Sequence, residues 1–486
     1  MSRLRTVRTL LLGAIGSVAL VIGGLGAGGV LVYDPVLARL GMQGWRLGTG
    51  HTIAEVVVYI GVVLLVWAWV RLGRDVFARR VGSRAVLACA AGWLLPTLVS
   101  PPLFTRDVFS YIGQGALALH GYDPYSIGPA ILGGPIAANV HPFWLHTPAP
   151  YGPLFILLAK IVAWIIGAHL ILGVILMRLV LAVGLALLLW ALPRLVGELG
   201  GRLPVTLWLV VASPMMVVHL FGGPHNDLLM VGLLAAGVLL VLRGQHVGGI
   251  ALTTTAMAVK ATAGIALPFL VWVWAGHLEG TLRRRFLRAC SMAVGIFVVV
   301  FAACTLLAGV NLGWITALRA PTMIVNWLNP PTGVGIAVHA LASLFGNISE
   351  GAFVVVARGF GVLLLLYILI KQWWAARTGG IDAVRRLGLV LCAVAVLSPP
   401  TLPWYLSWGF VLLAARPWRK GPVAVVIALT MFLVIAYFPS GEDATHAWGY
   451  LTLAIAGSVF AGLAFDPPMW LRRLRDRSAR QQVAQQ

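Results

Sequence analysis

The sequence predicts an all-α protein: a polytopic bundle of about fourteen transmembrane helices, with no separate soluble domain in residues 1–486. Of the 486 residues, 60% are apolar and only 10% are charged, whereas soluble proteins carry roughly 25% charged residues. A soluble globular fold is therefore excluded. The apolar runs are long enough for repeated spans of about 20 residues each, and the basic residues gather in alternate connecting segments.

The helices are predicted in order from apolar runs separated by arginine clusters or by loops rich in Pro, Gly and Trp. The start, MSRLRTVRTL, is compatible with a signal peptide, but the apolar run after it spans about 22 residues and has no clean cleavage site. We therefore expect a retained first helix. The fourteen expected spans are residues 10–32, 53–71, 84–100, 170–193, 203–220, 227–243, 247–260, 263–276, 289–310, 351–374, 386–399, 403–415, 421–438 and 447–465.

The formal charge of +21 arises from 35 Lys and Arg against 14 Asp and Glu, a balance that in a soluble protein would indicate nucleic-acid binding. If the N-terminus is cytoplasmic, the spans above place 27 of the 35 cations in cytoplasmic segments, as the positive-inside rule requires. The predicted membrane topology thus explains most of the net positive charge. No nucleic-acid partner is expected, and both termini are predicted to be cytoplasmic.

Two further apolar segments, 153–168 and 333–346, would invert every later loop if each were a full span. They are interpreted as interfacial or re-entrant helices on the outer side. They belong to, or follow, the two long outer loops, 101–152 and 310–350. The four cysteines all lie in apolar stretches, so neither a disulfide framework nor a metal cluster is indicated.

The loop of about fifty residues from Ser100 to Gly152 is the first candidate for function, because long loops in compact proteins are commonly functional. Residues 108–119 can form an amphipathic interfacial helix, with Asp107 in its first turn. Asp107 is equally compatible with a general base and with a carboxylate that pairs with Arg106 and stabilises the helix start. Asp123, in GYDPYS, more readily fits a turn.

Two other segments bring polar residues to the same outer side. In FGGPHNDLLM (221–230), His225, Asn226 and Asp227 open a helix and could bind a sugar, a phosphate or a cation; a helix N-cap would explain one of the three. Lys260 interrupts the apolar run TAMAVKATAGIALP, and an ionisable residue at this depth indicates a functional site. Phosphate is its natural partner, with snorkelling to lipid headgroups as the alternative.

Aromatic residues in SPPTLPWYLSW (398–408), Trp404 and Tyr405 among them, and Arg319 in the loop 317–333 lie on this side too. Each aromatic residue alone would fit the membrane-interface belt, but the cluster between Pro turns favours a binding groove. The sequence has no P-loop, Rossmann, HExxH or CxxC motif and no DxD pair. No cofactor is predicted, and the substrate donor is expected to be a phosphate-bearing lipid already in the membrane.

The motifs TRDVFSYIGQG, HGYDPY, PYGPLF, GGPHNDLLM, VKATAG and LPWYLSW resemble those of the actinobacterial α-1,6-mannosyltransferases MptA and MptB. The resemblance covers about residues 90–440. It implies a GT-C membrane glycosyltransferase fold in the plasma membrane, with the active site facing the periplasm. The implied donor is polyprenyl-phosphate-mannose, and the implied acceptor is a lipid-anchored α-1,6-mannan of lipomannan and lipoarabinomannan synthesis. Because the donor is β-linked and the product α-linked, the transfer would invert the anomeric centre, which requires one base rather than two carboxylates.

The resemblance also implies site roles. Asp107 corresponds to the family's acidic base, and the donor phosphate would be held by Lys260, His225, Arg106 and Arg319. Residues expected to line the sugar or acceptor side are Asn226, Asp227, Tyr111, Asp123, Tyr151, Trp404 and Tyr405. No metal is predicted, although the HND segment could serve one. Initiation and elongation of the mannan are not distinguished.

Two alternatives stay open. A related enzyme could use another polyprenyl-phosphate sugar, with arabinofuranose or glucose in place of mannose. A lipid or sugar transporter is disfavoured, because transporters place ionisable residues near the membrane midplane and often contain repeats, whereas the polar residues here gather at one boundary and no repeat is evident.

Overall fold

A computed structural model describes residues 2–346 and 349–467, and within these ranges the regular structure is helical, apart from one isolated bridge between Tyr437 and Asp443. The predicted all-α architecture is confirmed. Each of the fourteen expected spans overlaps an observed helix, and the two segments interpreted as interfacial form α8 (Pro153–Ile166) and α16 (Pro330–Ala342).

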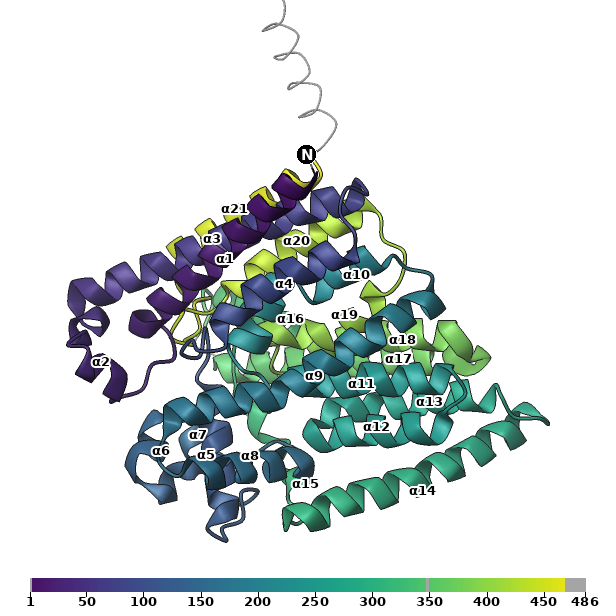
Figure 1. The fold of residues 1–486 in the computed structure, drawn as a ribbon. Coiled ribbons are helices and arrows are strands. Elements are labelled where there is room, and N and C mark those ends of the chain that lie inside the picture. The colour runs from purple at the N-terminus through teal and green to yellow at the C-terminus, as the bar shows by residue number, and fades with distance from the viewer. Residues whose placement is uncertain (1, 347–348, 468–486) are drawn as a thin grey trace, which may run out of the picture.

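The N-terminal and C-terminal helices lie together at one side of the molecule, where purple and yellow ribbons meet (Figure 1). α1 (Ser2–Ala27) and α3 (Gly48–Phe77) pack along each other. At their crossing, a Cβ on Gly16 would lie 2.8 Å from the carbonyl oxygen of Gly61, so glycine permits the close approach that is typical of membrane helices. The other helices here are α2 (Pro35–Arg39), α4 (Ser83–Thr97), α20 (Lys420–Val434) and α21 (Trp448–Phe465).

The long loop 101–152 folds into a compact set of short helices beside α8 (Figure 1). Its amphipathic segment is α5, which spans Asp107–Leu119 as expected and packs against α8. The close contact requires Gly115, because a Cβ there would lie 2.2 Å from the carbonyl oxygen of Ala159. The remaining helices of this loop are η2 (Pro129–Leu132), α6 (Gly134–Asn139) and α7 (Pro142–Leu145).

The centre of the bundle is built on α9 (Leu170–Leu199) and α11 (Asp227–Leu242), which cross at Gly184 and Gly232. A Cβ on Gly232 would lie 2.2 Å from the carbonyl oxygen of Gly184, so this crossing fixes the position of α11 on α9. α12 (His246–Val259) and α13 (Ala266–Ala275) follow as short helices separated by η4 (Ala261–Ile265), and α10 (Leu203–Val210) is followed by a π-helical turn, η3 (Met215–Gly222).

The C-terminal half completes the bundle. α14 (Leu282–Ala308) runs along one edge of the molecule (Figure 1). α17 (Glu350–Ala375) packs on α16, and α18 (Gly380–Leu397) packs on α19 (Ser407–Ala414). The short elements between them are α15 (Trp314–Ala317), η5 (Ala320–Met323), η6 (Ala376–Thr378) and η7 (Pro403–Leu406).

Within the described residues, six helices are long and apolar enough to cross a membrane, or seven if the bent pair α10 and η3 counts as one span. Most of the other expected spans are helices of 8–18 residues, shorter than the roughly 20 residues that a straight crossing needs. The figure of about fourteen spans and the cytoplasmic termini therefore stay predictions. The C-terminal arginines, Arg472 to Arg480, lie outside the described residues.

Candidate active site

Five segments that are far apart in the sequence meet around one cavity of about 160 Å³. They are the start of α5, the end of the 101–152 loop, the break between α12 and η4, the stretch with Leu318 and Pro321, and the Pro-rich segment that leads into α19. Six of the residues predicted for the site line this cavity: Asp107, Tyr111, Tyr151, Lys260, Trp404 and Tyr405.

Asp107 is the first residue of α5, and its backbone N–H donates to Thr105 Oγ1 at 3.1 Å. The turn before it is held from both sides: Phe104, at a left-handed φ of 57°, donates its N–H to the Pro439 carbonyl at 3.0 Å, and Leu103 donates to the Gly222 carbonyl at 3.3 Å. The Asp107 side chain lines the cavity and is 17% exposed. The carboxylate is thus rigidly placed and accessible.

The carboxylate Oδ2 of Asp107 lies 3.5 Å from Nδ1 of His225. Burial by itself would raise the pKa of Asp107, but the contact with His225 and the nearby His141 and Lys260 outweigh it and hold the pKa below its ordinary value. Asp107 is therefore ionised at neutral pH, the state that a general base requires.

His225 is fully buried behind the cavity wall and stacks on Trp404, with ring centroids 3.5 Å apart. The segment Gly222-Gly223-Pro224 brings it there: a Cβ on Gly223 would lie 2.3 Å from the Leu103 carbonyl oxygen. Glycine at this position therefore allows the loop that carries His225 to approach the loop that carries Asp107. The histidine positions the carboxylate rather than facing the cavity.

Lys260 is paired with Asp227. Its Nζ donates to both carboxylate oxygens at 2.8 Å, and the indole Nε1 of Trp408 donates to Oδ1 at 2.5 Å. The ammonium also lies 4.5 Å from the ring centroid of Tyr405, a cation–π distance. Asp227 is completely buried, so its charge is compensated internally. Among the described lining residues, Asp107 is consequently the one carboxylate open to a substrate.

Tyr111 and Tyr151 form the wall next to Asp107, in an edge-to-face contact with centroids 5.2 Å apart. Burial and the neighbouring negative groups raise the pKa of both phenols well above their ordinary range. Both hydroxyls therefore stay protonated and can donate hydrogen bonds to a substrate oxygen.

The other predicted residues lie away from this arrangement or behind it. Arg106 donates from Nη2 to the Asn139 carbonyl at 3.1 Å, which ties the start of α5 to α6. Asn226 is buried next to His225, and its amide has no hydrogen-bond partner within the described part of the chain. Arg319 is exposed and does not line the cavity.

Asp123 also lies apart from the cavity. Its Oδ1 accepts from the Tyr125 N–H and its Oδ2 from the Asn311 amide, both at 2.9 Å. The carboxylate thus closes a turn, as the sequence GYDPYS favoured, and it links the loop 101–152 to the loop 310–350.

No sequence motif pointed to Arg178, which the structure places between the segments that precede Asp107 and His225. It lies in α9 with its side chain fully buried and donates to the carbonyls of two segments: Leu98, Ser100 and Pro101, which precede Asp107, and Phe221 and Gly222, which precede His225. The signal that could have identified it is an arginine inside a 30-residue apolar helix, where a charge is costly unless it has a function.

No group of three or more His, Cys, Asp or Glu side chains within residues 2–346 and 349–467 is arranged to hold a metal ion. The long apolar helices and the cavity that holds Asp107 and Lys260 define a helical membrane protein with an internal site. Comparison with known families identifies the kind of membrane protein. Residues 10–276 match the family model described as "Alpha-(1->6)-mannopyranosyltransferase, N-terminal domain", and residues 331–465 match "MptB C-terminal domain". The chain belongs to this family of mannosyltransferases, and the resemblance inferred from its motifs is confirmed.

Individual relatives agree. The chain is 40% identical to alpha-(1->6)-mannopyranosyltransferase A of Mycobacterium tuberculosis, over 93% of this chain and 88% of the relative. It is 31% identical to the protein of the same name from Corynebacterium glutamicum, over 92% and 95% of the two chains, and 31% identical to a probable alpha-(1->6)-mannopyranosyltransferase of Mycolicibacterium smegmatis, over 88% and 82%. No solved structure matches the chain.

Proposed function

We propose that this mannosyltransferase transfers mannose, with inversion, from polyprenyl-phosphate-mannose to a lipid-anchored α-1,6-mannan, at a GT-C-type site on the periplasmic side of the plasma membrane. The observation that carries the proposal is a single accessible, ionised carboxylate, Asp107, beside the cation Lys260. The side of the membrane is supported by the distribution of basic residues, and the membrane-borne donor by the apolar surroundings of the site.

In the proposed reaction, Asp107 accepts the proton of an acceptor 6-hydroxyl while that oxygen attacks the anomeric carbon. The bond between the anomeric carbon and the phosphate oxygen breaks, and the polyprenyl phosphate leaves. Inverting displacement needs one base, which agrees with the two carboxylates having different roles: Asp107 faces the cavity, whereas Asp227 is held by Lys260 and Trp408.

The leaving phosphate is stabilised by preorganised donors, which are effective because they need no rearrangement as charge develops. Lys260 supplies a cation with two N–H bonds already directed to Asp227, and therefore one remaining donor for the phosphate. The protonated hydroxyls of Tyr111 and Tyr151, which line the same cavity, add neutral donors. Trp404 and Tyr405 are placed to contact a sugar ring. The proposal includes no metal or other cofactor.

The test is transfer from labelled polyprenyl-phosphate-mannose to a short α-1,6-mannoside by membranes that contain the protein. Asp107→Asn should lower kcat by roughly 10²–10⁴-fold, the contribution of a general base. Asp123→Asn is the matched control, since that carboxylate lies outside the cavity. Equal rates for wild type and Asp107→Asn would show that Asp107 is not the base. Faster transfer from arabinofuranosyl or glucosyl donors would show that mannose is not the preferred sugar.

A further inference from the structure

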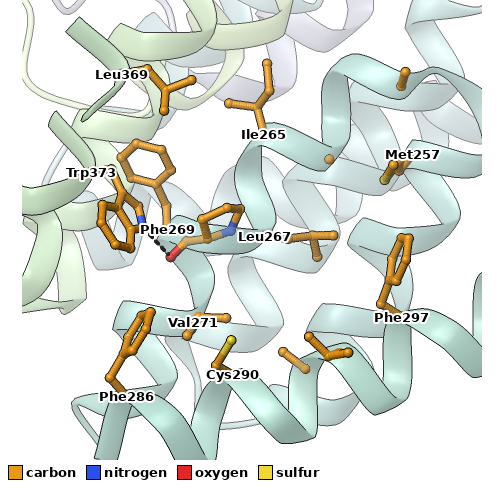
Figure 2. Close-up of a pocket in the computed structure, with 15 residues that line it drawn as sticks. Met257, Ile265, Leu267, Phe269, Val271, Phe286, Cys290, Phe297, Leu369 and Trp373 are labelled. Atoms are coloured by element: carbon orange, nitrogen blue, oxygen red, sulfur yellow. Dashed lines mark hydrogen bonds between the residues drawn. The ribbon is translucent and has the colours of Figure 1, made fainter. Parts of the chain in front are cut away.

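An apolar groove of about 740 Å³ lies between α13, α14 and α17 (Figure 2). Leu267 lies at its centre, Phe286 and Phe297 face it from α14, and Trp373 faces it from α17. The indole N–H of Trp373 donates to the Pro268 carbonyl at 3.2 Å, so this polar group of the wall is already satisfied. The surface offered to an occupant is almost entirely hydrocarbon.

The groove lies next to the active-site cavity, and the two share one wall residue. Ala261 lines both hollows, and the residue before it is Lys260, whose ammonium faces the cavity. The helix that ends at Lys260 also contributes Met257 to the groove. A ligand with an anionic head at Lys260 and an apolar extension could therefore continue directly into the groove.

The groove is also open to the outside of the bundle. Val294, which lines it, is 53% exposed, and α14 is one of the helices long and apolar enough to span a membrane. From Phe297, near Met257, to Phe286, near Val271, α14 advances by eleven residues (Figure 2), or roughly 16 Å at 1.5 Å per residue. An extended chain can lie along this length without entering the packed core.

We propose that this groove binds the hydrocarbon chain of the lipid-phosphate donor, with the first units of the chain at Ala261 and later units along α13 and α14. The inference rests on the proposed function for the identity of the head group, and it adds the place where the lipid is held. The alternative occupants, a helix of a second copy or the C-terminal segment of this chain, would not explain why the groove adjoins the active-site cavity at Ala261.

A labelling experiment tests occupancy directly. In a background with the four native cysteines replaced, Val294→Cys places a thiol in the groove, and Val299→Cys places one on a different face of the same helix, where the side chain is 69% exposed and lines no part of the groove. Decaprenyl phosphate at ten times its dissociation constant should slow thiol labelling at position 294 about tenfold and leave position 299 unchanged. A two-isoprene phosphate or inorganic phosphate should protect neither.

A kinetic experiment in the native cysteine background provides the second readout. Val294→Trp fills the groove without touching the cavity, and each methylene displaced from an apolar contact weakens binding about fourfold. We expect KM for a ten-isoprene donor to rise at least tenfold, with kcat and the KM of a two-isoprene donor unchanged. Val299→Trp should behave as wild type.

The outcomes separate this inference from the proposed function. Unchanged KM for the long-chain donor in Val294→Trp, or equal protection of positions 294 and 299, would overturn the lipid groove while mannosyl transfer stands. Protection of position 294 that depends on protein concentration would assign the groove to a second copy. Protection of position 294 that is lost on removal of residues 468–486 would assign it to the C-terminal segment. Protection by decaprenyl phosphate without mannosyl transfer from any donor would retain the groove and refute the function.

Discussion

Replacement of Arg178 should disrupt both the stability and the catalytic geometry of the protein. Arg178→Met removes every hydrogen bond that the guanidinium donates, including those at 2.6 Å to Gly222, 3.0 Å to Leu98 and 3.0 Å to Pro101. Arg178→Lys keeps the charge but replaces a planar set of five donors by three on one nitrogen.

The magnitude follows from the contacts. The carbonyls that Arg178→Met leaves without a donor cost about 1–3 kcal/mol each where water cannot reach them. We therefore expect Arg178→Met to lose roughly 4 kcal/mol or more, and Arg178→Lys about half of that, because a single ammonium can serve about half of these acceptors. Thermal unfolding in detergent measures both as a lowered Tm.

The same contacts predict a kinetic effect that a simple loss of stability would not produce. Arg178 ties the segment before Asp107 to the segment before His225, so its loss should relax the 3.5 Å contact between those two residues. Assayed well below its Tm, Arg178→Met should show a reduced kcat with little change in donor KM, and Arg178→Lys should recover part of it. The matched control is Arg194→Met on the same helix, where the guanidinium is partly exposed and donates to the Trp190 carbonyl at 2.6 Å. If Arg178→Met matched Arg194→Met in Tm and kcat, the positioning role would be refuted.

Two further substitutions test the charges of the site. His225→Phe keeps the ring stacking but removes the largest of the contacts that lower the pKa of Asp107 against its burial. That pKa should rise, so the acid limb of the kcat/KM profile should move to higher pH, and an unmoved limb would contradict the assignment. Asp227→Asn leaves the Lys260 ammonium without its carboxylate and should lower the free energy of unfolding by about 3–5 kcal/mol. Adding Lys260→Met should restore Tm but not activity. A double variant as unstable as the single one would contradict the pairing.

Sequence patterns predicted the helices well and their lengths less well. Apolar runs between Pro, Gly and Arg clusters predicted a helix within each of the fourteen segments, because local composition decides where a helix can form. Breaks depend on tertiary contacts: the expected span 203–220 is divided into α10 and η3, which are bent by 52° relative to each other. The span count therefore could not follow from hydropathy alone.

In the candidate site, the sequence likewise identified individual residues but not the contacts between them. Asp107, Lys260 and His225 stood out because each is a polar residue in an apolar or glycine-broken context. Their partners are separated by long stretches of chain, 33 residues in the case of Lys260 and Asp227, so the pairing depends on how α11 and α12 pack. No sequence pattern could have shown that Asp227 is an internal counter-ion rather than a sugar ligand.

The groove along α14 opens to the outside of the bundle, so a donor that enters it arrives by lateral diffusion and not from bulk water. The relevant substrate concentration is then a surface density, expressed as mole fraction of membrane lipid. Turnover at fixed total donor should fall as inert lipid or detergent is added, because dilution takes place in two dimensions while the amount of donor per volume stays constant.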